Sequence, residues 1–437
     1  MTKGKRVGVI SLGCDKNRID TEKMLFILSE RHTLTKNPED AQILIINTCA
    51  FLESSRKEAI EEILWGIELK NLGLEKLIVT GCLPQKFIGE TFDALPEVDA
   101  FLGVSDYGQI NEIIDRTYKG ERVNAVGLPR GECGKKRVLT TNGYAYLKIA
   151  DGCSNHCTYC LIPKIRGKFR SVPKDDLIEE VKGLGEIKEL ILVAQDLTKY
   201  GADLDGNVNL CSLIRELSKL DTVKGIRLLY CYPEGVSEEL IKELKENPKL
   251  IKYIDIPFQH ASDRVLKLMN RKGTFSSNLS LIERLRKEVL GIAIRSTFIT
   301  GFPTESEEDF NTLLEFIKVA KLTNAGFFKY SREKDTPAYK LDGQVPARIK
   351  ESRIRKLYTA QKKVVKEWTK NLVGKTVKVS VEGFDEEQLV YYGRAYFNAP
   401  DVDGKVYFFS QEEVEPSEEI NVRIKKAFDY DLYGDRV

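Results

Sequence analysis

The first third of the chain alternates short apolar runs with segments of helical periodicity. Three apolar runs have the length and β-branched composition of buried strands: 6–12, 43–47 and 76–80. Three further segments repeat apolar residues at helical spacing: 21–31, 53–69 and 108–118. Strands that alternate with helices favour parallel pairing. This region therefore predicts an open parallel α/β domain.

A second α/β series follows a segment at 129–140 that is rich in Gly, Lys and Arg and that we expect to be an exposed linker. Six apolar runs of this series predict strands: 144–149, 189–194, 225–230, 253–257, 293–300 and 326–330. Six strands are fewer than the eight of a closed βα barrel. We expect an incomplete βα barrel, similar to a TIM barrel, followed by a basic helix within 344–370.

The pattern changes after residue 370. Four short strand patterns are separated by Gly, Asp and Pro turns: 376–382, 389–397, 405–409 and 421–428. Such a run of short strands is typical of a small β-barrel. The predicted domains are 1–138, 139–370 and 371–437.

Composition and charge narrow the class of protein. The longest apolar runs, 43–46 and 190–194, are far too short to cross a bilayer. The 68 Lys and Arg and the 66 Asp and Glu leave a net charge of +2, so no global field recruits nucleic acid or membrane. The basic start runs into Gly13 and Cys14 without a cleavage site, and we expect a cytoplasmic chain whose nine cysteines stay reduced.

Three cysteines directly follow the first predicted strand of the second series. Cys153, Cys157 and Cys160 form a CxxxCxxC motif, and three thiolates this close together can wrap one compact metal centre. Zinc is the alternative, with His156 as a candidate fourth ligand. Structural zinc sites, however, usually pair two CxxC motifs, and this sequence has no second pair. The spacing therefore favours an iron–sulfur cluster.

Three other cysteines are far apart in sequence but equivalent in position. Cys14, Cys49 and Cys82 each follow a predicted strand of the first series. The carboxyl ends of parallel strands share one edge of a sheet, so these three side chains should converge. A single cysteine of this kind is most often a small buried hydrophobic residue. Three at equivalent positions instead favour a second metal site.

The segment around Cys153 resembles the radical S-adenosylmethionine (SAM) enzymes, in which a tyrosine such as Tyr159 precedes the last cysteine. The resemblance implies a 4Fe–4S cluster held by Cys153, Cys157 and Cys160, with one iron left open for SAM. It also implies that SAM is cleaved reductively to a 5′-deoxyadenosyl radical. An incomplete βα barrel with the cluster loop after its first strand is the fold of such enzymes.

Four segments are similar to those of one branch of these enzymes, the methylthiotransferases: SLGC at 11–14, NTCAF at 47–51, TGCL at 80–83 and AYLKIADGCSNHCTYCLIPKIRGKFRS at 145–171. The resemblance covers essentially the whole chain. It implies a second, auxiliary 4Fe–4S cluster on Cys14, Cys49 and Cys82, and a carboxyl-terminal TRAM β-barrel. The auxiliary cluster would hold the sulfur to be inserted, and a second SAM would methylate it.

In this family the ends of the barrel strands line the SAM pocket. The resemblance therefore makes Gln195, Asp196 and Arg295, with Tyr159, candidate cofactor-binding residues, although without the family they are ordinary polar residues. No catalytic side chain is assigned. The family commonly has glycine where this chain has Thr304, and we expect an altered turn there because threonine takes positive φ less readily.

Other polar residues and cysteines carry weaker expectations. Cys133, Cys211 and Cys231 match neither cysteine set, and we expect them to serve packing. We expect His260 to hydrogen-bond locally and His32 to end a surface helix, neither acting as a ligand. The alternating basic residues after the cysteine loop are either a solvated stretch or part of the cofactor site: Lys164, Arg166, Lys168 and Arg170.

Substrate choice divides the methylthiotransferases into two types. Leu12, Lys16, Asn17 and the segment 166–171 resemble the RimO type, which acts on an aspartate of small-subunit ribosomal protein twelve, more than the MiaB type, which acts on a tRNA adenosine. From Lys375 onward the chain has 8 Lys or Arg and 14 Asp or Glu, a balance of −6. Such a barrel suits a basic ribosomal protein better than phosphates. The helix within 344–370, at +7, argues weakly the other way.

The RimO-type resemblance implies conversion of the aspartate to 3-methylthioaspartate, with an electron donor and the free ribosomal protein or the assembled subunit as partners. It implies no membrane partner, and tRNA is a partner only under the MiaB-type alternative. A non-catalytic iron–sulfur or zinc adaptor is the alternative from another class. A pure electron carrier needs full cysteine ligation, however, and each set here supplies three cysteines.

Overall fold

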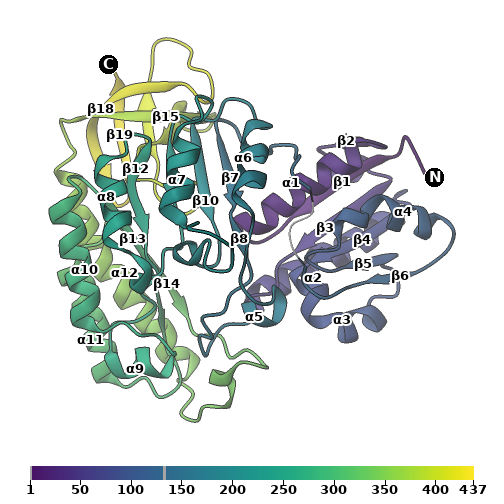
Figure 1. Cartoon of the computed structure of the whole chain (residues 1–437), viewed down its shortest axis with the longest axis horizontal. Helices are drawn as coiled ribbons and strands as arrows, with labels where there is room; N and C mark the ends of the chain where they lie inside the picture. Colours follow the sequence, from purple (N-terminus) through teal and green to yellow (C-terminus); the bar gives the residue numbers. More distant parts are fainter. Residues whose placement is uncertain (1, 131–133) are drawn as a thin grey trace.

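The computed structural model describes residues 2–130 and 134–437. Figure 1 shows an amino-terminal parallel sheet with its helices (purple to blue), a middle domain built on a second parallel sheet (teal to green), and a carboxyl-terminal β-barrel (yellow). Helix α1 (Asp15–Ser29) lies between the first two of these parts and contacts the middle sheet through its strand β7 (Tyr144–Lys148).

The amino-terminal sheet has the strand order β2-β1-β3-β4-β5-β6, and all of its pairs are parallel. Its strands are β1 (Arg6–Ser11), β2 (Thr33–Thr35), β3 (Ile43–Thr48), β4 (Lys76–Gly81), β5 (Ala100–Leu102) and β6 (Val123–Ala125). Besides α1, its helices are α2 (Glu53–Lys70), α3 (Cys82–Ala94) and α4 (Ile110–Tyr118). The predicted open parallel α/β domain is confirmed, while β2, β5 and β6 were too short to predict.

The middle sheet has the order β14-β13-β12-β11-β10-β7, and its pairs are again all parallel. With β7, its strands are β10 (Glu189–Val193), β11 (Ile226–Leu228), β12 (Leu250–Asp255), β13 (Ala293–Thr300) and β14 (Asn324–Lys329). In the described residues β7 and β14 remain edges, because no strand pair joins them. The incomplete βα barrel is therefore confirmed.

Helices cover the outer face of this curved sheet: α6 (Lys174–Lys182), α7 (Leu210–Ser218), α8 (Glu238–Glu246), α10 (Phe275–Glu288), α11 (Glu307–Ala320) and α12 (Ala347–Lys370). The short helix α9 (Asp263–Leu268) lies beyond the carboxyl ends of the strands. The short helix α5 (Ile162–Ile165) and the two-residue strands β8 (Ala150–Asp151) and β9 (Arg170–Ser171) flank the cysteine loop. None of the described helices is both long and apolar enough to span a membrane.

The carboxyl-terminal barrel is closed, with the strand order β15-β16-β17-β19-β18. Its strands are β15 (Thr376–Asp385), β16 (Val390–Arg394), β17 (Val406–Phe409), β18 (Glu419–Phe428) and β19 (Asp431–Arg436). The barrel shares one hydrophobic cluster with the middle sheet, in which Val379 and Val422 join Tyr146, Ile191 and Tyr253. The barrel therefore packs against the middle sheet.

Candidate functional site

The loop of Cys153, Cys157 and Cys160 leaves the carboxyl end of β7, as the sequence predicts. Backbone hydrogen bonds hold it at both ends: the Cys153 N–H donates to the Gly167 carbonyl at 3.1 Å, and the Cys160 N–H to the Cys157 carbonyl at 3.1 Å. Thr158 fixes the centre, because its N–H donates to Met269 at 3.1 Å and its carbonyl accepts from Ala338 at 2.8 Å. The loop is therefore anchored by distant parts of the middle domain.

All three thiols of this loop are free and partly buried. Burial raises the pKa of Cys153 and Cys160, and the negative charge of neighbouring Cys157 raises each further. The backbone N–H of Ile162 donates to the Cys160 sulfur at 3.4 Å. A buried thiol with a raised pKa stays neutral until a metal takes the place of its proton. Three neighbouring thiols with this chemistry fit a cluster.

An aromatic and a cationic side chain that sequence reasoning missed stand beside this loop. The Tyr232 hydroxyl lies 2.7 Å from the Cys157 sulfur. The Arg271 guanidinium stacks over the Tyr232 ring at 3.7 Å and donates to the Pro257 carbonyl at 2.6 Å. Tyr232 lies shortly after strand β11, and this position was the available signal, whereas Arg271 follows helix α9 and had no such signal. Together they wall one side of the cysteine loop.

The second cysteine set comes from three separate loops of the amino-terminal sheet. Cys14 is the residue before α1, Cys49 directly follows β3, and Cys82 opens α3 after β4. The N-terminus of a helix carries partial positive charge, which favours a thiolate or an anionic cluster there. The predicted equivalence of the three positions is confirmed by this placement.

Two glycines let these loops approach one another. Gly13 has φ +91, and a Cβ there would lie 2.6 Å from the Cβ of Cys49. Gly81 has φ +97, and a Cβ there would lie 2.4 Å from Asn47 Oδ1 and 2.5 Å from the Thr48 carbonyl. Both the sign of φ and the lack of space exclude other residues. The glycines of the SLGC and TGCL segments thus bring the cysteine loops together.

The three thiols lie close enough for their charges to interact. Burial raises the pKa of Cys49 and, to about 12, that of Cys82, and in both cases Cys14 raises it further. Within the described residues no three His, Cys, Asp or Glu side chains converge on a single metal ion. A 4Fe–4S cluster asks for a different arrangement, since each thiolate binds a different iron of the cube. Free thiols at three strand ends fit that arrangement.

The candidate SAM contacts fall into two groups. Gln195 donates to Asp151 at 3.1 Å, while its buried Oε1 has no hydrogen-bond partner among the described residues. Asp196 is fully buried and accepts from Asn155 at 2.8 Å. Arg295, in contrast, is already paired with Asp255 at 3.1 Å and with Asp403 of the carboxyl-terminal barrel at 3.3 Å. Gln195 is the candidate with a free buried acceptor; the roles of all four, including the half-buried Tyr159, remain predictions.

The remaining expectations have mixed outcomes. Cys211 and Cys231 are buried in the core of the middle domain, which confirms their packing role, whereas Cys133 lies outside the described residues. His260 accepts from the Ser262 N–H at 3.0 Å, as expected. His32 follows α1 and directly precedes β2, where it is buried rather than on a surface helix.

Arg166 bears on an expectation that was left open, and Thr304 differs from its expectation. Arg166 is 1% exposed, so the basic stretch after the cysteine loop is not uniformly solvated. The sequence predicts an altered turn at Thr304, but Thr304 takes φ +65, so the turn keeps the left-handed conformation that glycine would adopt there. Hydrogen bonds hold it there: the Thr304 N–H donates to Gly343 at 2.8 Å, and Arg264 donates to the Thr304 carbonyl at 2.6 Å.

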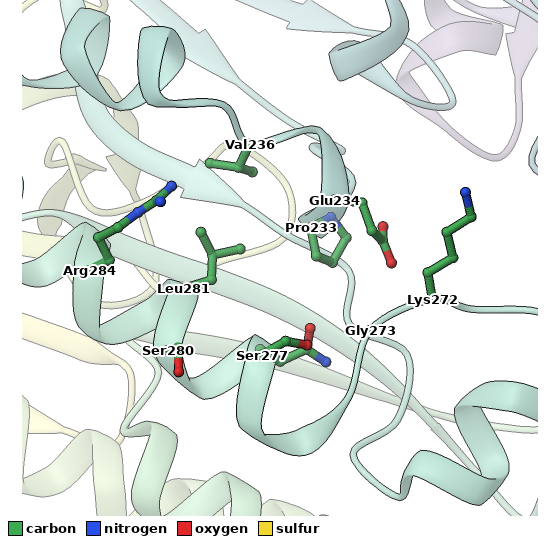
Figure 2. Close-up of a pocket in the computed structure, with 10 residues that line it drawn as sticks. Pro233, Glu234, Val236, Lys272, Gly273, Ser277, Ser280, Leu281 and Arg284 are labelled. Carbon is green, nitrogen blue, oxygen red and sulfur yellow. The ribbon is translucent and has the colours of Figure 1, made fainter.

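A surface pocket of about 490 Å³ lies next to the wall formed by Tyr232 and Arg271. Figure 2 shows Pro233 and Glu234 on one side of it and Ser277 and Leu281 of α10 on the other. Its lining mixes charges of both signs, from Glu234, Lys272 and Arg284. Because Pro233 and Lys272 directly follow the two wall residues, the pocket borders the cysteine loop without containing it.

Comparison with known proteins defines the class. Residues 147–317 match the radical SAM superfamily, residues 6–103 match "Uncharacterized protein family UPF0004", and residues 373–437 match the TRAM domain. A solved structure of the radical SAM methyltransferase TsrM from Kitasatospora setae has a TM-score of 0.56 and 13% identity, over 77% of this chain and 74% of that one. The chain thus has the fold and the cysteine motif of a radical SAM enzyme with a TRAM barrel.

Its relatives define the family more narrowly. A protein of Clostridium botulinum (strain Eklund 17B / Type B) named ribosomal protein uS12 methylthiotransferase RimO is 47% identical over 99% of this chain and 98% of its own length. The protein of that name from Acetivibrio thermocellus is 45% identical over 99% and 98%. The chain belongs to the RimO family of methylthiotransferases. Membership implies two 4Fe–4S clusters and SAM as cofactors.

Proposed function

We propose that this chain is a radical SAM transferase that converts an aspartate of ribosomal protein uS12 to 3-methylthioaspartate. The observation that carries the proposal is the full-length similarity to proteins named for that activity. The two cysteine sites support it, because they occur in one chain and each offers three free thiols. An electron carrier or a zinc adaptor needs no second site of this kind.

We assign the SAM cluster to Cys153, Cys157 and Cys160 and the auxiliary cluster to Cys14, Cys49 and Cys82. When bound, these groups supply the reductive cleavage of SAM and the sulfur of the methylthio group. The side chains around them bind and position. Gln195 offers a buried acceptor to a ligand with N–H or O–H donors, which SAM has in its amino group and ribose. Tyr232 and Arg271 exclude water from one side of the loop.

The charge of the carboxyl-terminal barrel supports a basic protein as the substrate. Five of its glutamates are exposed and close together in sequence: Glu412, Glu413, Glu415, Glu418 and Glu419. Changing all five to lysine should weaken binding of uS12, and the loss should grow as salt is lowered, because the charges of both partners then have the same sign and are less screened. Iron content should stay unchanged, since these residues contact neither cysteine site.

The decisive experiment incubates the anaerobically reconstituted enzyme with SAM and a strong reductant, in parallel with free uS12, with assembled small subunits and with unmodified tRNA. Mass spectrometry should show one added methylthio group on an aspartate of uS12 and none on tRNA. A methylthio group on adenosine with unmodified uS12 would overturn the proposal in favour of the MiaB type. Comparing free uS12 with subunits identifies the physical form of the substrate.

We also keep the predicted domain boundaries 1–138, 139–370 and 371–437 as a proposal. We place the reaction in the cytoplasm, where ribosomal proteins are made and assembled. An electron donor is required, because reductive cleavage of SAM consumes an electron.

A further inference from the structure

One buried arginine joins the two cysteine sites. Arg166 lies directly before Gly167, whose carbonyl accepts from the Cys153 N–H at 3.1 Å. Its guanidinium reaches out of the middle domain to α1, where it donates to Asn17 Oδ1 at 2.7 Å and to Asp20 at 3.0 Å. It also donates to Asp151, two residues before Cys153, at 3.0 Å. Arg166 therefore contacts both the SAM-cluster loop and the amino-terminal domain.

Asn17, which accepts a hydrogen bond from Arg166, also contacts the loops of the auxiliary site. Its Nδ2 donates to the Leu12 carbonyl at 2.9 Å and to the Thr48 carbonyl at 3.0 Å, so it ties the loop of Cys14 to the loop of Cys49. The Cys82 thiol donates to Asn17 Oδ1 at 3.8 Å. Asn17 is fully buried and lies one helical turn after Cys14. A single carboxamide thus contacts all three cysteine loops and Arg166.

Two positive and two negative side chains meet at this contact. Arg166 and Lys148 face Asp20 and Asp151, and all four side chains are buried. Buried ion pairs with several fixed hydrogen bonds hold one geometry, because any displacement leaves a charge unpaired in a poorly solvated place. The arrangement is suited to fixing the distance between the two sites.

We propose that Asn17 and Arg166 are positioning residues that hold the auxiliary-cluster site in register with the SAM-cluster loop. The proposal rests on the assignment of both sites under the proposed function. The substrate has to meet a radical source on one side and a sulfur source on the other, so the distance between the sites sets how often a radical leads to product. Misplacement by about 1 Å can cost roughly 100-fold in rate.

The test compares Arg166→Gln, Arg166→Lys and Asn17→Ser with a matched control, Arg137→Gln. Arg137 is also buried between domains and pairs with Glu22 of α1 at 2.9 Å and with Glu180 at 3.2 Å, but no described contact joins it to a cysteine loop. The first readout is the amount of methylthio product formed per 5′-deoxyadenosine released. The second is the midpoint potential of the auxiliary cluster, measured without substrate in a chain whose Cys153, Cys157 and Cys160 are changed to Ala.

Arg166→Gln and Asn17→Ser should release 5′-deoxyadenosine yet form roughly 10-fold to 100-fold less product per radical. Arg166→Gln should also lower the midpoint potential of the auxiliary cluster, because a positive charge near a cluster favours its reduced form. Arg166→Lys keeps the positive charge and should therefore have a potential close to that of the wild type. Arg137→Gln should change neither readout. Equal defects in Arg166→Gln and Arg137→Gln, or an unchanged ratio and potential in Arg166→Gln, would overturn the proposal. A wild-type chain that makes no product refutes the proposed function instead, since the potential is measured without substrate.

Discussion

The two cysteine sites of this chain are built in opposite ways. The SAM-cluster cysteines all lie within one loop, which backbone hydrogen bonds to Gly167, Met269 and Ala338 anchor in the middle domain. The auxiliary cysteines come from three strand ends, and the sheet, two close-packed glycines and the Asn17 side chain bring them together. A single-loop site depends on few residues, whereas a dispersed site depends on the fold of a whole domain. The dispersed site should therefore be the one that distant substitutions damage first.

The largest expected effect separates the two sites by their ligands. Changing Cys153, Cys157 and Cys160 to Ala should leave about half of about eight irons per chain after anaerobic reconstitution, because each site holds one 4Fe–4S cluster. Iron analysis and visible absorption measure this. Stoichiometric zinc, or loss of all metal in the triple variant, would contradict the assignment.

Single substitutions should then separate the roles of the sites. Cys49→Ala should still cleave SAM under strong reduction but form no methylthio product, because the radical source is intact and the sulfur source is not. Cys157→Ala should abolish both. If a folded Cys49→Ala chain no longer cleaved SAM, the assignment of the amino-terminal site to sulfur transfer would be wrong.

A substitution at a glycine should break only the dispersed site. In Gly81→Ala the new Cβ meets Asn47 and the Thr48 carbonyl, and φ is +97, so the loop of Cys82 has to move. We expect about 1–3 kcal/mol of lost stability and loss of about half of the iron. The control is Gly89→Ala, at an exposed position of helix α3, which directly follows Gly81; a Cβ there meets no atom within 4 Å. This variant should keep all of its iron, and its free energy of unfolding should rise by about 0.5–1 kcal/mol.

The contrast between the sites also explains what the sequence could predict. Both cysteine sets were found, because one is a local motif and the other repeats after successive strands. The contact that joins them was not predicted, since Asn17 and Arg166 meet only through tertiary packing across 149 positions of sequence. The start of α1 was missed for a related reason: its buried face carries Lys16, Asn17, Asp20 and Glu22, so apolar residues do not recur at helical spacing.

In the carboxyl-terminal region the sequence was similarly incomplete. The closed barrel was expected from four strand patterns, but its fifth strand, β19 (Asp431–Arg436), has only one fully apolar buried side chain, Leu432, and so shows no alternation of hydrophobic residues. Three-residue strands such as β5 were not predicted for a simpler reason: they are too short to show a periodic pattern.

A substitution far from both cysteine sites should lower the stability of the chain without damaging one site more than the other. Glu189 of β10 pairs with Arg227 and, at 3.0 Å, with Arg394 of the carboxyl-terminal barrel. Burial works to raise the pKa of Glu189, but the two arginines outweigh it and lower the pKa from 4.5 to about 2. Glu189→Gln leaves both arginines without their anion, and we expect a loss of about 3 kcal/mol or more at neutral pH.

The pH dependence of this pair follows from the direction of the shift. Because the pKa is lower in the folded chain, the stabilisation by Glu189 is complete above about pH 4.5 and declines as the pH falls toward 2. The difference in melting temperature between the wild-type and Glu189→Gln metal-free chains should therefore shrink below about pH 4.5. A difference that stayed constant through this range would show that the ion pair is not its source.

The smallest expected effect concerns the turn beside the single-loop site. Thr304 holds φ +65, which costs about 1 kcal/mol or more for a residue with a Cβ. Thr304→Gly removes this strain, but it also removes a 3.2 Å hydrogen bond from Arg264 to the threonine hydroxyl and gives the unfolded chain more freedom. These terms oppose one another at similar size, so the free energy of unfolding should change by less than about 1 kcal/mol. SAM cleavage should stay at its wild-type rate, because the cysteine loop is held by Met269 and Ala338 rather than by this turn. A large fall in SAM cleavage would instead show that the single-loop site depends on its surroundings as strongly as the dispersed one.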